Sequence, residues 1–279
     1  MTRDYFVFLV QNNEQQESPV FPEGLASGFV DKVSVWFFER DKVKARRRYV
    51  DHAGRDIDIP NFISQTEPNF SSLPSPNWLA FQVDFELLTP CYSKDDRVFH
   101  LMDNPVRKDR LYGVPFMAAS SWKGMLRWAC RMQEGLVAFL ESGKSFEQDW
   151  RDPDWIVHLF GNEKGESEEF NRGALVFYPT WFDRIGFEVI NPHSRERRAG
   201  TQPIYYEVVP PGAKGTLSLL YAPWPGMKPE AKATEVLPKL FEAMETLLTN
   251  YGISAKRTVG WGTAKIGKWC ACQKTREKI

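Results

Sequence analysis

Two segments with helical periodicity, set among strand-forming runs, constrain the fold of this chain more than any other feature. From about residue 120 to residue 140, apolar side chains recur three and four positions apart, which is the spacing of an amphipathic helix. The pattern returns from about residue 234 to residue 251, and Gly252 then ends the helix. Either Ser120 or Ser121 suits the N-terminal cap of the first helix. The sequence therefore predicts two helices that each bury one face.

Strand-forming segments precede, separate and follow these helices. Residues 79–88 alternate apolar and polar side chains, which predicts a strand with one buried face. Further strands are expected at 173–182, 200–207 and 215–221, and after the second helix. The order strand, helix, strands, helix, strand is that of a ferredoxin-like, RRM-like βαββαβ palm of the α+β class. Both helices should then cover the same face of one sheet.

The front part of the chain is less regular. The apolar run at residues 5–10 is too short to span a membrane, and it lacks a signal-peptide cleavage pattern. We therefore interpret it as a strand. Residues 30–50 predict a β-hairpin, because two β-branched and aromatic runs flank a polar tetrapeptide. The second arm carries Arg46, Arg47 and Arg48. These cations fit either an edge strand protected by charge or a phosphate-contacting arm.

A proline- and serine-rich segment at 71–78 marks a boundary between two parts of the chain. We expect an N-terminal extension with the basic hairpin over residues 1–78, and the ferredoxin-like domain, with inserted thumb or loop elements, over residues 79–279. The 36 basic and 36 acidic residues cancel. This balance excludes a uniformly basic surface and leaves local basic patches open.

The four cysteines are too few for a disulfide framework, and their spacing indicates no pairing. We expect reduced thiols in a cytoplasmic protein. Cys270 and Cys272 have no second cysteine or histidine pair nearby, whereas a structural zinc ion takes four ligands. No structural zinc is therefore expected.

The start of the first helix combines hydroxyl groups with a row of cations. Lys123, Arg127 and Arg131 recur every four residues and therefore share one helix face. Ser120 and Ser121 place hydroxyls beside the unpaired backbone amides of the first turn, which suit a phosphate. The alternative is an ordinary amphipathic helix with a solvated basic stripe.

A glycine-rich loop precedes the last strand. Gly260 and Gly262 flank Trp261, and Lys256 and Arg257 come just before them. Glycines allow a backbone to approach a ligand closely, and the two cations complement phosphate charge. The alternative is a turn that only leads into the strand.

Taken together, these two segments resemble the signatures of the RAMP superfamily, the repeat-associated subunits of CRISPR effector complexes. That family carries a small-residue, Ser-Ser-x-Lys-Gly helix start, which residues 119–124 match, and a following arginine, which Arg127 matches. It also carries a glycine-rich loop before its last strand, which residues 252–262 match. The Leu-Phe-Gly sequence at 159–161 resembles a third landmark, and the resemblance covers about residues 79–269.

A loop upstream of the first helix extends the resemblance. Residues 103–109 are similar to the Asp-x-Pro-Val-x-x-Asp loop in the backbone subunits of type III complexes, where the first aspartate is needed to cut target RNA. The resemblance implies that Asp103 is a catalytic residue and that Mg²⁺ or Mn²⁺ is the cofactor for cleavage. It also implies guide CRISPR RNA, complementary target RNA and other subunits as partners in an antiviral ribonucleoprotein. Asp95, Asp96 and Asp109 are weaker candidates for metal contact.

The resemblance implies sequence-tolerant contacts to the guide, in which cations bind phosphates and Trp122 or Trp261 stacks on a base. The expected RNA-binding residues are Ser120, Ser121, Trp122, Lys123, Arg127, Lys256, Arg257, Gly260, Trp261, Gly262, Arg46, Arg47 and Arg48.

Other functions stay open at this point. Ala119 and Ser254 stand where the family usually has glycine. Residues 191–193 and the tyrosine-rich strand after them look more like the subunits that cap the filament, some of which do not cut. A non-catalytic capping subunit is therefore the main alternative. A metal-free guide-processing endonuclease would draw on residues such as His52, His100 and Tyr92. Separately, His193 lies in a basic loop for which a solvated surface loop is favoured over a catalytic role. A general RRM-type protein is disfavoured, because residues 79–88 lack the aromatic spacing used for stacking.

Overall fold

The computed structural model describes residues 32–33, 36–37, 39–54, 57, 68–97, 100–109, 111–162, 171–192 and 203–274. The strand predicted at 5–10 and the candidate His193 lie outside these residues. None of the helices in the described ranges is long and apolar enough to cross a membrane.

Four antiparallel strands form the central sheet, in the order β3, β7, β1, β8. They are β1 (Leu79–Leu87), β3 (Leu175–Phe177), β7 (Lys214–Tyr221) and β8 (Ala264–Gln273). Among these four strands, β1 and β3 are consecutive in the chain, but β7 lies between them in the sheet. Likewise, β7 and β8 are consecutive in the chain, but β1 lies between them in the sheet. Each crossover therefore skips one strand, as in the split βαβ units of a ferredoxin-like fold. The predicted fold class is confirmed.

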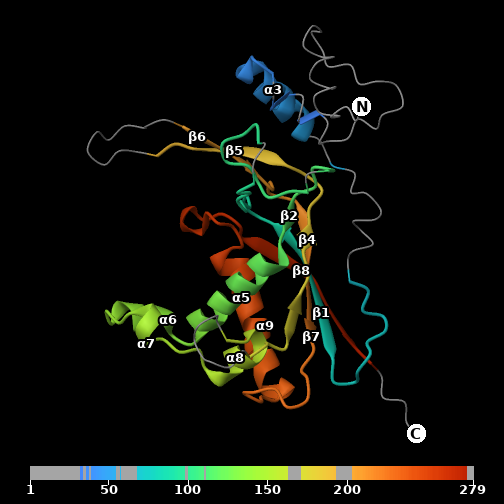
Figure 1. Ribbon diagram of the computed structural model, residues 1–279, viewed down its shortest axis with the longest axis vertical. Coiled ribbons are helices and arrows are strands. Elements are labelled where there is room, and N and C mark those ends of the chain that lie inside the picture. The colour runs from blue at the N-terminus through green and yellow to red at the C-terminus, as the bar shows by residue number, and fades with distance from the viewer. Residues whose placement is uncertain are drawn as a thin grey trace, which may run out of the picture.

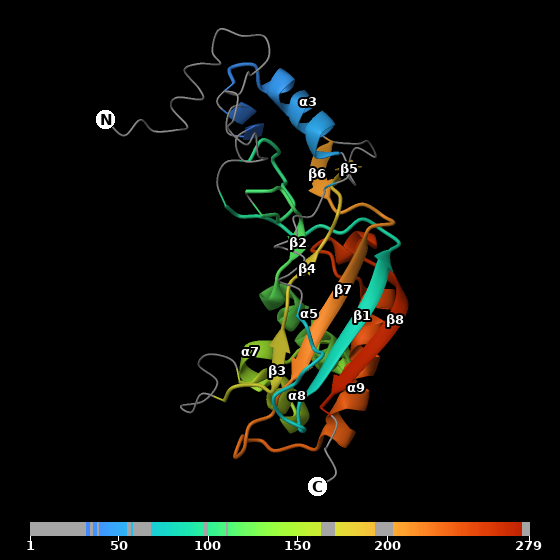
Figure 2. The same cartoon turned by 90° about the vertical axis from the view of Figure 1, so that its right-hand side faces the viewer.

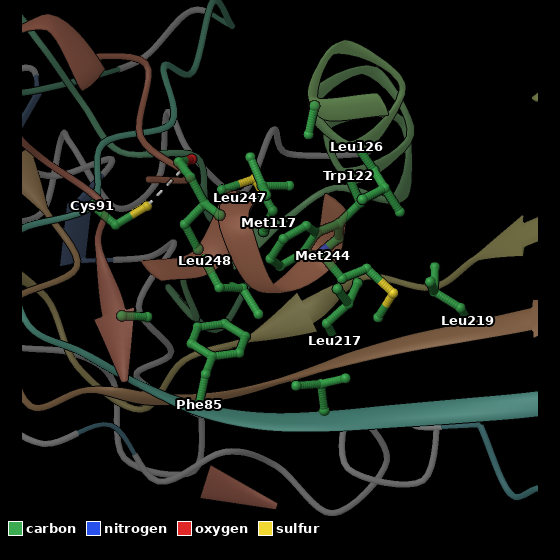
Figure 3. Close-up of a cluster of buried hydrophobic side chains, with 14 of the residues drawn as sticks. Phe85, Cys91, Met117, Trp122, Leu126, Leu217, Leu219, Met244, Leu247 and Leu248 are labelled. Atoms are coloured by element: carbon green, nitrogen blue, oxygen red, sulfur yellow. Dashed lines mark hydrogen bonds between the residues drawn. The ribbon is translucent and has the colours of Figure 1, made fainter. Parts of the chain in front are cut away.

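The two crossover helices lie on the same face of this sheet (Figures 1 and 2). They are α5 (Ala119–Gln133) and α9 (Ala233–Thr246), and α9 continues into a π-helical turn, η1 (Leu247–Tyr251). Figure 3 shows their shared core, where Trp122 and Leu126 of α5 and Met244 of α9 face Phe85 of β1 and Leu217 of β7. The apolar faces predicted for both helices are therefore the faces that pack against the sheet.

The first helix is shorter than its periodicity predicts. α5 ends at Gln133, and Gly135 then takes a left-handed conformation with φ 85° before a separate helix, α6 (Leu136–Glu141), begins. The expected serine cap is also wrong: Ala118 is the N-cap residue, and its methyl side chain cannot accept a hydrogen bond from the first amides.

Several short elements are inserted around the palm. They are β2 (Phe116–Met117), α7 (Phe146–Asp149), α8 (Asp154–Phe160), β4 (Thr180–Trp181), β5 (Gly186–Ile190), β6 (Ile204–Val208) and the 3-10 turn η2 (Arg257–Val259). β2 pairs with β4, and β5 pairs with β6 in a two-stranded ribbon that projects beyond the central sheet (Figure 1). The sequence did not predict β5.

The predicted basic hairpin is wrong, because its second arm is a helix, α3 (Lys42–Ala53). The carboxylate of Asp41 caps this helix by accepting a hydrogen bond of 3.0 Å from the backbone N–H of Lys44. Ala45, Tyr49 and Ala53 recur every four residues and are buried in the same cluster as the side chains of β1. The run of basic residues between them concealed this helical period in the sequence.

Candidate nucleic-acid interface

The glycine-rich loop rests directly on α5. The guanidinium carbon of Arg257 lies 4.1 Å from the centroid of the Trp128 ring, and Trp128 also packs edge-on against Tyr251 at 4.9 Å. Burial lowers the pKa of Arg257. Its Nη1 atom is buried and has no hydrogen-bond partner within the described parts of the chain. The structure thus joins the two segments that the sequence singled out and leaves a donor of Arg257 unused.

Two of the loop glycines are required by the loop itself. A Cβ on Gly262 (φ 93°) would lie 2.3 Å from the backbone nitrogen of Ser254, and one on Gly252 (φ 78°) would lie 2.6 Å from the carbonyl oxygen of Trp261. The sequence predicted that these glycines let a ligand approach the backbone closely. In the structure they instead let the two ends of the loop approach each other. Gly260 (φ 80°) is exposed, and a Cβ there would meet nothing within 4 Å.

Ser254 has a structural purpose that explains the absence of glycine at this position. Its buried hydroxyl oxygen accepts hydrogen bonds from the backbone N–H groups of Tyr92 at 3.0 Å and Lys256 at 3.1 Å. The hydroxyl also lies 3.3 Å from the carbonyl oxygen of Tyr92, to which it donates. Ser254 therefore fastens the glycine loop to the segment that follows β1.

An aromatic cluster supports the other side of the loop. Trp261 packs edge-on against Tyr206 at 5.7 Å, and Tyr206 packs against Tyr92 at 5.1 Å. The ammonium group of Lys256 lies 5.1 Å from the centroid of the Tyr206 ring, within the range of a cation–π contact. Trp261 is half-buried in this cluster, so only part of its ring remains available to a base.

The start of α5 presents a cation at a helix N-terminus that has no side-chain cap. Ser120 and Lys123 are exposed, and the first turn contains no acidic residue. Partial burial, and then the positive charge of Arg127, lower the pKa of Lys123. Because a helix N-terminus disfavours a cation and favours an anion, this end of α5 suits a phosphate group.

Arg127 and Arg131 do not form the predicted phosphate-binding stripe. The carboxylate of Asp152 accepts a hydrogen bond from Nε of Arg127 at 2.7 Å and from Nε of Arg131 at 2.6 Å. Nη2 of Arg131 and the indole N–H of Trp150 donate further bonds to it, at 2.8 and 2.9 Å. Burial raises the pKa of Asp152, but these bonds and charges more than offset the effect and lower the pKa overall. The two arginines fix α5 to the segment before α8.

Trp122 cannot stack on a base, contrary to the prediction. Its side chain is fully buried, and its indole N–H donates a hydrogen bond of 3.0 Å to the hydroxyl of Thr180. The ring packs edge-on against Phe85 of β1 at 6.0 Å. Trp122 is therefore a core residue of the palm.

The Asp103 loop is tied to β6. The carbonyl of Asn104 accepts a hydrogen bond of 3.0 Å from the backbone N–H of Glu207, and the Asn104 side chain donates to the carbonyl of Tyr205 at 2.9 Å. The buried carboxylate of Glu207 accepts from the backbone N–H of Val106 at 3.0 Å and pairs with the ammonium group of Lys108. These bonds fix the loop while the Asp103 side chain stays 77% exposed.

The three predicted arginines of α3 differ in their surroundings. Arg46 binds the carboxylate of Asp103 at 2.8 Å and the carbonyl oxygen of Leu101 at 3.1 Å. Arg48 pairs with Glu39 at 3.2 Å. Arg47 is exposed on the same helix. Only Arg47 has the open surroundings that the sequence predicted for all three.

The weaker carboxylate candidates are engaged elsewhere. Two hydrogen bonds from the side chain of Arg97, at 2.8 and 2.6 Å, hold buried Asp95. Asp96 pairs with Lys94 at 2.7 Å. Asp109 instead accepts from the backbone N–H groups of a turn, at residues 111 and 112, both at 3.0 Å.

These carboxylates do not converge on Asp103. No three His, Cys, Asp or Glu side chains come together as metal ligands anywhere in the described ranges. A Mg²⁺ ion at Asp103 would thus have one protein carboxylate and would rely on RNA phosphates and water, a donor set that Mg²⁺ accepts.

The residues proposed for metal-free guide processing also have separate neighbours. His52 packs edge-on against Trp36 at 5.6 Å, and His100 lies 3.6 Å from the carboxylate of Asp95. Burial, with smaller contributions from nearby Tyr206 and acidic groups, raises the pKa of Tyr92 to about 12. A phenol that holds its proton this strongly is a poor general base at neutral pH.

The open face of the sheet does not resemble a base-stacking platform. The side chains of β1 that face away from α5 and α9 include Gln82, Asp84 and Glu86. Asp84 accepts a hydrogen bond of 2.8 Å from Thr216 of β7. Further along the same face, Ala80 and Leu220 are buried in a small apolar cluster with Phe70 and Leu73.

Sequence reasoning missed the buried polar groups that hold the site together. Glu207, Tyr49, Lys108 and Asp152 were not among the predicted site residues, although each is buried or half-buried and bonded to a site element. A lone carboxylate within the apolar run at 204–209 was the one local signal for Glu207.

Comparisons with known proteins identify the family and similar folds. The family model of the RAMP superfamily matches residues 84–265. The fold is similar to a chain of the type III-B Cmr-beta complex solved by cryo-EM bound to cognate target RNA, with a TM-score of 0.55, 18% identity, and coverage of 84% of this chain and 78% of that chain. A chain of the Csm3-Csm4 subcomplex of the type III-A CRISPR-Cas interference complex matches with a TM-score of 0.42, 18% identity, and coverage of 70% and 77%. No curated protein matches the chain.

Proposed function

Because the chain belongs to the RAMP superfamily, we propose that it is a subunit of a type III CRISPR effector complex that binds guide RNA and cuts target RNA through Asp103. The observation that carries the proposal is the contact of Arg257 with Trp128, which brings the two family signatures together on α5. The similarity of the fold to a chain from a complex bound to target RNA supports the same assignment.

The guide would lie along the glycine loop and the start of α5. Lys123, Lys256 and Arg257 supply positive charge there, and exposed Ser120 lies in the first turn of α5, which has no side-chain cap. Charge and helix amides of this kind bind a phosphate backbone without reading its sequence. Target sequence would then be read through pairing with the guide.

Cleavage would depend on positioning. RNA breaks when its 2′-hydroxyl is aligned with the departing 5′-oxygen, and holding one nucleotide in that pose can lower the barrier by about 7 kcal/mol at best. Asp103, exposed on a fixed loop, would orient the 2′-hydroxyl or accept its proton. A Mg²⁺ or Mn²⁺ ion held by Asp103 and RNA would neutralise phosphate charge.

One observation favours the alternative of a non-catalytic capping subunit. None of the other acidic side chains described nearby points a second carboxylate at Asp103. In this case the chain would bind guide RNA and complete the filament without cutting.

The decisive experiment replaces Asp103 by Ala in the reconstituted effector complex. We expect the cut opposite this subunit to disappear while guide and target RNA remain bound. Asp51→Ala, which removes an exposed carboxylate from α3, should cut like the wild type. Unchanged cutting by Asp103→Ala would establish the capping role instead.

A separate measurement tests the guide site. The affinity for guide RNA should fall steeply as salt concentration rises, since each neutralised phosphate releases counterions. An affinity that does not depend on salt would contradict the phosphate contacts, whatever the result at Asp103.

A further inference from the structure

We propose that Arg46 is a positioning residue for Asp103, so that α3 contributes a side chain to the cleavage site. This inference rests on the proposed function of Asp103. Arg46 lies upstream of residues 84–265, the part that the family model matches. The family match therefore does not include α3.

The contacts of Arg46 define one orientation of its guanidinium group. Its Nη2 atom donates to Oδ1 of Asp103 at 2.8 Å, and its Nε atom donates to the carbonyl oxygen of Leu101 at 3.1 Å. The planar fork of arginine can make two such bonds at once, which the ammonium group of lysine does not reproduce. Arg46 thus binds both the backbone of the Asp103 loop and the carboxylate of Asp103.

The helix that carries Arg46 is fixed relative to this loop. Tyr49, one turn further along α3, donates its hydroxyl to the buried carboxylate of Glu207. The same carboxylate accepts a hydrogen bond of 3.0 Å from Val106 in the Asp103 loop. Ala45 and Ala53 are buried on the same side of α3. Both the helix and the loop are therefore anchored on one side chain of β6.

The pair remains open to solvent, with Arg46 49% and Asp103 77% exposed. An exposed ion pair contributes little to folding stability, so its main consequence is geometric. A carboxylate on a loop would otherwise sample several rotamers, and misplacement of a reacting group is costly in rate. Arg46 holds Asp103 in one rotamer while leaving RNA a path to it.

The experiment uses the assembled effector complex with guide RNA. Single-turnover cutting and target affinity are measured for the wild type, Arg46→Ala, Arg46→Lys and a control, Lys44→Ala, which removes an exposed cation from the same helix. We expect both Arg46 variants to cut at least tenfold more slowly with target affinity unchanged. The control should match the wild type, and added methylguanidinium should restore cutting to Arg46→Ala but not to Asp103→Ala.

The outcomes separate this inference from the proposed function. Wild-type rates for both Arg46 variants, together with an inactive Asp103→Ala complex, would overturn the positioning role and leave the function of Asp103 intact. Full activity of Asp103→Ala would overturn both. A loss of target affinity that accounts for the slower cutting would make Arg46 a phosphate-binding residue instead. If Arg46→Ala fails to assemble, Arg46→Lys alone decides, since it keeps the charge.

Discussion

The guanidinium carbon of Arg257 lies 4.1 Å above the centroid of the Trp128 ring, so a cation from the glycine-rich loop is stacked on the helix that begins with the Ser-Ser-x-Lys-Gly sequence. The planar guanidinium is held by the ring and by burial, while its Nη1 atom has no acceptor among the residues described. If Arg257 binds an RNA phosphate, as we propose, its stacking on Trp128 would set the orientation of the guanidinium before RNA binds.

Replacing Arg257 by Ala should weaken guide RNA binding and reduce the slope of log affinity against log salt by about one, as expected for one lost phosphate contact. Filter binding across a salt series measures both quantities. Arg257→Lys should restore the slope but only part of the affinity, because lysine keeps the charge and loses the stacking. Lys268→Ala, at an exposed position on β8, should leave both unchanged. An identical effect of the Arg257 and Lys268 substitutions would mean that general charge, rather than this contact, governs binding.

Trp122 should contribute to stability and not to RNA recognition, because its side chain is fully buried and bonded to Thr180. We expect Trp122→Ala to lower the free energy of unfolding by about 3–5 kcal/mol. Trp122→Phe keeps an aromatic ring in the core and should cost less, including about 1 kcal/mol for the lost hydrogen bond. Urea denaturation gives these values. Weaker RNA binding by Trp122→Phe at unchanged stability would show that the ring does reach the nucleic acid.

Two glycines of one loop should respond differently to the same substitution. Both have positive φ, but a Cβ on Gly262 would lie 2.3 Å from a backbone nitrogen, whereas one on Gly260 would enter open space. Gly260→Ala should therefore cost about 1–2 kcal/mol for the left-handed conformation alone. Gly262→Ala should cost more, since the loop must also move. Thermal unfolding of the two variants compares them, and equal melting temperatures would contradict the packing of this loop.

Much of the palm could be predicted from local sequence patterns. Alternation at 79–88 corresponds to β1, and the second helical period corresponds to α9 with η1. The break after Gln133 was missed because apolar residues continue at helical spacing beyond it, and the left-handed Gly135 interrupts the backbone without interrupting that spacing. In α3 the helical period was hidden instead. Its three buried positions lie four residues apart, and the residues between them are mostly charged.

The candidate site was harder to predict because partners distant in the sequence determine it. Lys123, Arg127 and Arg131 share a helix face by spacing, but only the position of Asp152 in the fold decides that the two arginines are buried ion-pair partners. Arg46 and Asp103 are 57 positions apart, and no local pattern relates them. Spacing can therefore identify candidate cations, whereas their partners follow only from the tertiary structure.

Asp95 should make the stability of the protein depend on pH in the acid range. Burial raises its pKa, but the hydrogen bonds and charge of Arg97 more than offset this and lower the pKa to about 2. The pKa of an unfolded Asp is about 3.9, so between these values the unfolded chain binds more protons than the folded chain. The stabilisation from Asp95 is therefore complete above about pH 4 and is lost as the pH falls towards 2.

Thermal unfolding of Asp95→Asn and the wild type across this range tests the expectation. At neutral pH the variant should melt at a lower temperature, and the difference should shrink as the pH falls from about 4 to about 2, because the wild-type carboxylate becomes increasingly protonated as the pH approaches its pKa of about 2. Asp96→Asn serves as the control, since Asp96 pairs with Lys94 at the surface, with 72% and 60% of the side chains exposed, and such pairs add little stability. A difference between Asp95→Asn and the wild type that stays constant down to pH 2 would show that the charge of Asp95 is not what stabilises this region.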